Sequence, residues 1–225
     1  MDWGILHLSG TPAPLPPEAW ADVGVNRILT VAMLAVSLLL LKDYLRLLPL
    51  LGGCLVRSRG NLEIEHSVSQ ARNRNRCALA GLGILCLVCD RCGLYPAGFI
   101  AGLAPEWRVA AIFGIFEAYI LLHRMASALL RKPRLDAEGR TAAGNALFNY
   151  FLAGLPLMLL SAGLMWLFKA SDASVRAVLL AELFAVMAVT LLREGQILSS
   201  KYSPLQTFLY LCGLEIIPLA ALIII

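Results

Sequence analysis

Three carboxylates interrupt apolar stretches of this sequence, and they are its strongest candidates for chemistry. Glu117, Glu182 and Glu215 each lie inside a run of mainly apolar residues. Burying an acid in a membrane costs about 2.5 kcal/mol or more unless it is paired or hydrated, so such an acid marks a functional site by default. Ion pairing, proton transfer and cation binding are the chemistries that these groups offer.

Charged side chains in two other apolar segments are the candidate partners of these glutamates. Arg27 lies near the start of the first segment, and Asp90 and Arg91 lie near the end of the second. At 1.5 Å per residue, the glutamates fall near the middle of a bilayer core about 30 Å thick. The sequence therefore predicts one intramembrane polar layer, in which Arg27 pairs with Asp90 and Arg91 with a glutamate. This layer would order the bundle; the alternatives are a proton or cation pathway and a site for a small cationic or lipid ligand.

Other polar residues lie close to these segments in the sequence. Broken helices surround many transporter sites, and a proline inside an apolar segment frees a backbone carbonyl. His123, beside Arg124, is interpreted as a boundary residue of its segment. The secondary candidates are Tyr210, Pro218, Asn145, Asn149, Tyr150 and His123.

The sequence contains no recognisable catalytic or metal-binding motif. HExxH, a Walker sequence and paired-glutamate boxes are absent. Cys86, Cys89 and Cys92 are spaced by three, which on a helix spreads them over neighbouring faces, so they are interpreted as small buried hydrophobes. We therefore expect no catalytic residue, metal or cofactor.

The composition is that of an integral membrane protein. Hydrophobic residues make up 59% of the 225 residues and charged residues 15%, with a mean hydropathy of +0.75; globular proteins have about 25% charged residues. We predict an all-α polytopic helix bundle in which residues 1–22 form a non-cytoplasmic segment and residues 23–225 the transmembrane domain. The six predicted spans are about 23–41, 77–98, 107–130, 146–168, 174–192 and 204–225.

Basic residues predict the orientation of these spans. Fourteen of the 19 lie in the connections after spans 1, 3 and 5 or, for Arg124, near the end of span 3. Cytoplasmic loops keep an excess of Lys and Arg, so both termini should face away from the cytoplasm.

The longest cytoplasmic loop is predicted at residues 42–76. Pro49 and the Gly52-Gly53 pair should break any long helix in its first half. The basic part, 57–76, acts as a topology determinant or contacts an anionic lipid or a protein partner, and its acidic residues argue against nucleic acid. Its candidate contact residues are Arg72, Arg74 and Arg76.

The C-terminal sequence carries a family resemblance. LYLCGLEIIPL, preceded by SKYSPLQTFLY, resembles the C-terminal signature of an uncharacterised family of multi-pass inner-membrane proteins in Bacteroidetes, classed as a domain of unknown function. The resemblance implies a six-span protein with no assigned activity, ligand or catalytic residues. It points first to Tyr210, Glu215 and Pro218.

Together these features favour a non-enzymatic component of the bacterial inner membrane, such as an accessory in envelope biogenesis. One alternative is a small secondary transporter or ion-coupled permease that uses the glutamate layer. The other is an intramembrane lipid enzyme without a recognisable motif.

Overall fold

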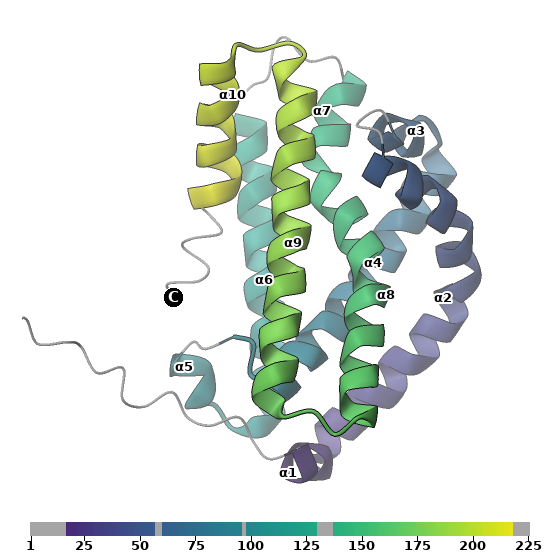
Figure 1. The fold of residues 1–225 in the computed structure, drawn as a ribbon, viewed down its shortest axis with the longest axis vertical. Helices are drawn as coiled ribbons and strands as arrows, with labels where there is room; N and C mark the ends of the chain where they lie inside the picture. The colour runs from purple at the N-terminus through teal and green to yellow at the C-terminus, as the bar shows by residue number, and fades with distance from the viewer. Residues whose placement is uncertain (1–16, 57–59, 96–97, 130–136, 218–225) are drawn as a thin grey trace, which may run out of the picture.

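The computed structural model describes residues 17–56, 60–95, 98–129 and 137–217, and every regular element in these ranges is helical (Figure 1). The all-α class predicted from composition is thus confirmed for this part of the chain. The elements are α1 (Pro17–Asp22), α2 (Gly24–Val56), α3 (Gly60–His66), α4 (Val68–Cys92), α5 (Gly98–Ala101), α6 (Pro105–Leu129), α7 (Ala137–Gly144), α8 (Ala146–Leu167), α9 (Asp172–Ser199), α10 (Pro204–Leu211) and the π-helical turn η1 (Cys212–Ile216).

Four described helices are long and apolar enough to cross a membrane, and they indicate a multi-pass membrane protein. Predicted spans 77–98 and 204–225 are not among these four. α2 turns a row of large apolar side chains outward, a surface that lipid covers and water does not. The row includes Ile28, Val31, Leu34, Leu38 and Leu39. The four helices are α2, Pro105–Ser127 of α6, α8 and α9.

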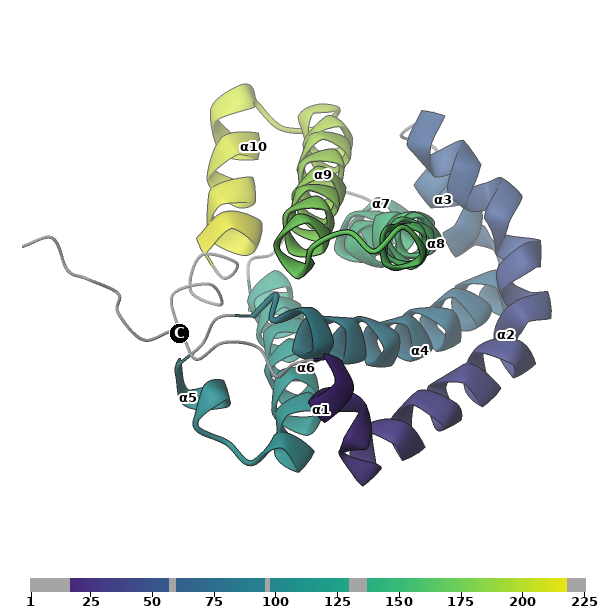
Figure 2. The ribbon, with the colours of Figure 1, turned by 60° about the horizontal axis from the view of Figure 1, so that its bottom comes forward.

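α4 lies inside the bundle, in contact with α2, α6 and α8 (Figure 2). Because protein covers it on several sides, few of its residues face lipid, and it can be less apolar than its neighbours. Its first turns carry the three basic residues at positions 72, 74 and 76. The buried side chains of its second half include Cys77, Leu82, Leu85, Cys86 and Cys89.

The prediction that Pro49 and the Gly52-Gly53 pair break any long helix in the first half of the predicted loop is wrong. α2 runs on as one helix to Val56, and α3 and the start of α4 occupy much of the remaining predicted loop. Pro49 removes one backbone hydrogen bond, but a buried stripe with helical spacing continues past it and holds the helix against the bundle. That stripe is Leu47, Leu51 and Cys54.

Two glycines mark places where helices approach closely. A Cβ on Gly60, the first residue of α3, would lie 2.7 Å from the backbone nitrogen of Cys54. A Cβ on Gly154 in α8 would lie 2.5 Å from Cγ2 of Val186 in α9. Small residues let membrane helices pack closely, so these glycines set the α2–α3 and α8–α9 distances.

α10 begins with a complete capping box. The Ser203 hydroxyl accepts a hydrogen bond from the Gln206 backbone, the Gln206 side chain accepts one from the Ser203 backbone, and Pro204 takes the first helical position. α10 lies beside α9 and continues into η1. Residues 218–225, and with them Pro218, lie outside the described part.

Candidate functional site

The polar contact with the strongest potential for proton or ion chemistry joins α6 to η1. Nε2 of His123 and Oε1 of Glu215 lie 2.5 Å apart, with 13% of the histidine side chain and 3% of the glutamate side chain exposed. A protonated histidine makes this contact an ion pair with no net charge, and loss of one proton leaves a neutral imidazole bonded to a carboxylate, with a net charge of −1. The pair can therefore change its charge without a large movement.

Further polar groups surround this pair. The ring of Tyr119, one turn before His123 in α6, stacks on the imidazole with centroids 6.2 Å apart. The Tyr119 hydroxyl and Oε2 of Glu215 are buried, and neither has a hydrogen-bond partner among the described residues. Glu194 of α9 is also buried and lies near enough for its charge to act on the Tyr119 hydroxyl. Three helical segments thus bring donors and acids to one place.

Glu215 lies in the π-helical turn, whose bounds are Cys212–Ile216. A π-helical turn holds more residues than an α-helical turn and appears frequently at functional sites. The wider turn changes the direction in which the residues after it point. In this chain the turn that contacts α6 carries the only acid of the described C-terminal segment 200–217.

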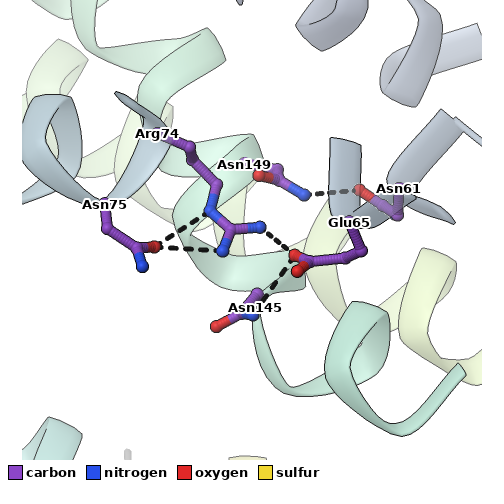
Figure 3. A network of polar contacts seen from close by, with 6 residues as sticks. All are labelled: Asn61, Glu65, Arg74, Asn75, Asn145 and Asn149. Carbon is purple, nitrogen blue, oxygen red and sulfur yellow. Dashed lines mark hydrogen bonds and ion pairs between the residues drawn. The ribbon is translucent and has the colours of Figure 1, made fainter. Parts of the chain in front are cut away.

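A second polar network lies at the end of the bundle where α3, the start of α4 and the start of α8 meet (Figure 3). Arg74 is buried and forms an ion pair with Glu65 of α3. Oε1 of Glu65 also accepts a hydrogen bond from Asn145, at 3.2 Å. Nε and Nη2 of Arg74 donate to the side-chain oxygen of Asn75, at 3.1 and 3.0 Å. A buried charge pair needs such additional bonds to offset desolvation.

The same network continues toward the end of α2. Asn149 donates to Asn61 at 2.9 Å, and Asn61 donates to the Tyr150 hydroxyl at 2.8 Å. Tyr150 donates in turn to the carbonyl oxygen of Cys54 at 3.3 Å, and Arg193 of α9 donates to the next carbonyl, that of Leu55, at 2.5 Å. The last carbonyls of a helix have no partners within it. Residues of α8 and α9 therefore cap the C-terminus of α2.

At the opposite end of the bundle, the predicted pairs of Arg27 with Asp90 and of Arg91 with a glutamate are replaced by tryptophan contacts. Nε1 of Trp20 donates to Asp90 at 2.6 Å. The Arg91 guanidinium lies 5.4 Å from the ring centroid of Trp20 and 4.7 Å from that of Trp166. Arg27 is exposed. Aromatic rings favour the membrane interface and attract cations, which explains this exchange of partners.

The three glutamates of the predicted polar layer lie at separate places in the bundle and have different contacts. Glu182 accepts a hydrogen bond from Ser161 at 2.9 Å, and Glu117 is half-buried on α6. Glu215 lies level with His123, which is six residues, or about 9 Å along the helix axis, from Glu117. No hydrogen bond or ion pair of the described residues joins two of the three.

The remaining predicted residues differ in their surroundings. Arg72 and Arg76 are exposed, whereas Arg74 between them is buried. Tyr210 packs edge to face on Tyr202, with ring centroids 5.3 Å apart.

Sequence reasoning missed several residues that the structure brings into these sites. The missed Asn61 and Glu65 are four residues apart on α3, and Asn145 and Asn149, which were already candidates from the sequence, are four apart at the start of α8. Residues at this spacing share a helix face, so the two matching pairs were a usable signal. The other missed residues are Tyr119, Glu194, Arg193 and Trp20.

No group of three His, Cys, Asp or Glu residues within the described ranges is arranged to hold a metal ion. No family model, curated protein or solved structure matches this chain.

Proposed function

We propose that the chain crosses the bacterial inner membrane six times with both termini outside the cytoplasm, and that it belongs to the Bacteroidetes family whose C-terminal signature its ending resembles. The placement of basic residues supports this orientation. The end of α2, the start of α4 and the α9–α10 connection lie at one end of the bundle (Figure 1). That end carries the excess of Lys and Arg typical of cytoplasmic faces. Its basic residues include Lys42, Arg46, Arg72, Arg76, Arg193 and Lys201.

Within this topology, the His123–Glu215 pair binds and releases a proton as the working group of a small ion-coupled permease. The observation that carries the proposal is the state of Glu215: one carboxylate oxygen contacts His123, and the other is buried without a hydrogen-bond partner among the described residues. A buried carboxylate oxygen without a partner is costly, and binding a proton or a cation removes that cost. The pair offers two protonation states that differ by one charge.

The neighbouring groups support proton movement rather than a static ion pair. Tyr119 stacks on His123 and presents a hydroxyl without a hydrogen-bond partner among the described residues. Glu194 of α9 is buried and lies near enough for its charge to act on this hydroxyl. Intramembrane chains of carboxylates and histidines mark proton relays in pumps and transporters.

Infrared difference spectra between acidic and alkaline samples test the proton-binding step. We expect a protonated-carboxyl band that disappears in Glu215→Gln and persists in Glu182→Gln, because Glu182 already accepts a bond from Ser161. A spectrum unchanged by Glu215→Gln contradicts the proposal.

Proteoliposomes test the transport step. With an imposed potassium diffusion potential and a trapped pH dye, the wild type should acidify the lumen. Glu215→Gln should stop this flux, because an amide does not exchange a proton at neutral pH, whereas Glu182→Gln should retain it. Equal flux through wild type and Glu215→Gln rules out a permease of this kind.

An accessory role in envelope biogenesis is the second candidate, and the exposure of Arg72 and Arg76 on α4 favours it. These side chains stand on the basic end of the bundle, where a partner protein can reach them. Co-purification from native membranes tests this role: a stoichiometric partner lost in Arg72→Gln supports it, and an isolated chain contradicts it.

A further inference from the structure

An apolar groove of about 770 Å³ runs between α2, α4 and α6. Its lining includes Met33 and Leu40 from α2, Leu87 from α4 and Phe113 from α6. Arg76 is the only charged residue among the lining residues, and it is exposed. The groove therefore combines an apolar wall with one cation.

Arg76 stands at one end of the groove. The α4 lining runs from Arg76 to Leu87 and the α2 lining from Leu40 back to Leu29, a separation of eleven residues on each helix. Eleven residues of helix extend about 16 Å, close to half of a hydrocarbon core about 30 Å thick. The groove thus has the depth of one membrane leaflet.

The charges beyond this end are mainly positive. Lys42 stands one turn beyond the lining residue Leu39 on α2, and Arg72 stands one turn beyond Arg76 on α4; both are exposed. The acid on this side, Asp43, accepts a hydrogen bond from Asn73 at 3.4 Å. Three basic side chains and one acid leave the mouth with a net positive charge.

We propose that this groove, called here the α2–α4–α6 groove, holds one acyl chain of an anionic phospholipid, with the headgroup phosphate bound by Arg76. The groove is about as deep as one leaflet, which is the depth that one acyl chain spans. The negative phosphate complements the positive charge around the Arg76 end of the groove. A guanidinium binds a phosphate through two parallel hydrogen bonds. The proposal rests on the membrane location of the protein and is independent of the proton-binding role.

Native mass spectrometry of the purified protein with added lipid tests the proposal. Dioleoyl phosphatidylglycerol should be retained more than dioleoyl phosphatidylcholine, which has the same chains and no net charge. Arg76→Gln should weaken phosphatidylglycerol binding about fivefold, the effect of removing one basic side chain near an anionic group, and should weaken phosphatidylcholine binding less, because choline offsets the charge of its phosphate. Lys201 is an exposed basic residue at the α9–α10 connection. Lys201→Gln is therefore the matched control, and it should bind phosphatidylglycerol as the wild type does.

A second variant tests the apolar wall. Ala110 of α6 lines the groove and is exposed, so Ala110→Phe should fill the space and lower retention of both lipids. Ala118 is also exposed on α6 but lies outside the lining. Ala118→Phe is therefore the control, and it should not lower the retention of either lipid.

Four outcomes overturn the proposal: equal retention of the two lipids, undiminished phosphatidylglycerol binding in Arg76→Gln, undiminished retention in Ala110→Phe, or full displacement of the lipid by inorganic phosphate. A dimer that disappears in Ala110→Phe also overturns it, because a second copy of the chain is then the occupant. Glu215→Gln should retain lipid as the wild type does, so this result is separate from the proton-binding test.

Discussion

The Tyr150 hydroxyl in α8 donates a hydrogen bond to the carbonyl oxygen of Cys54, 96 residues earlier in the chain, over 3.3 Å. The same hydroxyl accepts a bond from Asn61 of α3 at 2.8 Å. One side chain thus links three helices, and it does so where α2 has carbonyls without partners in the helix.

Tyr150→Phe should lower the stability of the protein by about 1–3 kcal/mol, because it leaves a buried carbonyl and a buried amide without this partner. The aromatic ring and its packing remain. Thermal unfolding in detergent, followed by circular dichroism, measures the change. Ser174→Ala is a control, because its hydroxyl contacts Ser171 at an exposed position. A Tyr150→Phe protein as stable as the wild type would show that this link does not matter.

Gly60→Ala should destabilise the contact between α3 and α2. The added methyl group would lie 2.7 Å from the Cys54 nitrogen and 2.8 Å from the Gly53 carbonyl carbon, and backbone atoms cannot move aside cheaply. Gly52→Ala is the matched control, because a Cβ there meets nothing within 4 Å. Alanine favours a helix by about 1 kcal/mol over glycine, so this control should be neutral or stabilising. Unfolding temperatures that fall equally in both variants contradict the packing argument.

Arg74→Gln should cost about 3–5 kcal/mol, because it leaves Glu65 buried without its ion-pair partner. The neighbouring change Arg72→Gln removes an exposed charge and should stay within about 0.5 kcal/mol of the wild type. Protease resistance of the folded protein in detergent distinguishes the two. Equal resistance of both variants would mean that the buried pair adds no stability.

Glu215→Leu should be less stable than Glu215→Gln. Glutamine keeps the shape of the side chain and can still bond to Nε2 of His123, whereas leucine leaves a mostly buried imidazole without this partner. Size-exclusion profiles and unfolding temperatures compare the variants. If Glu215→Leu is the more stable of the two, the His123 contact does not hold η1 against α6.

The orientation is open to a direct test. A reporter active only outside the cytoplasm should be active when fused after Ile225 and silent when inserted near Arg134, because the basic residues gather in the alternate connections. Both fusion points lie outside the described residues. The opposite activity at either point contradicts the six-span orientation.

Part of the candidate site was predictable from the sequence. The burial of Glu215 followed from its apolar neighbours alone, since a long uncharged stretch must leave water whatever it packs against. Its partner was not predictable. His123 lies 92 residues away, beside a basic residue that made it look like the end of a span. Only the packing of η1 against α6 decides that the two side chains meet.

The sequence by itself determined the helical class and the membrane-spanning character, because composition and hydropathy act locally along the chain. Tertiary structure decided the rest through contacts between distant segments. The buried stripe around Leu51 carries α2 past Pro49, and protein neighbours rather than lipid let α4 keep Arg74 in the interior. Asp90 contacts Trp20 rather than Arg27, since the choice between two partners depends on which helix faces are turned toward each other. A residue's type shows that it needs a partner, but only the packed bundle determines which partner it has.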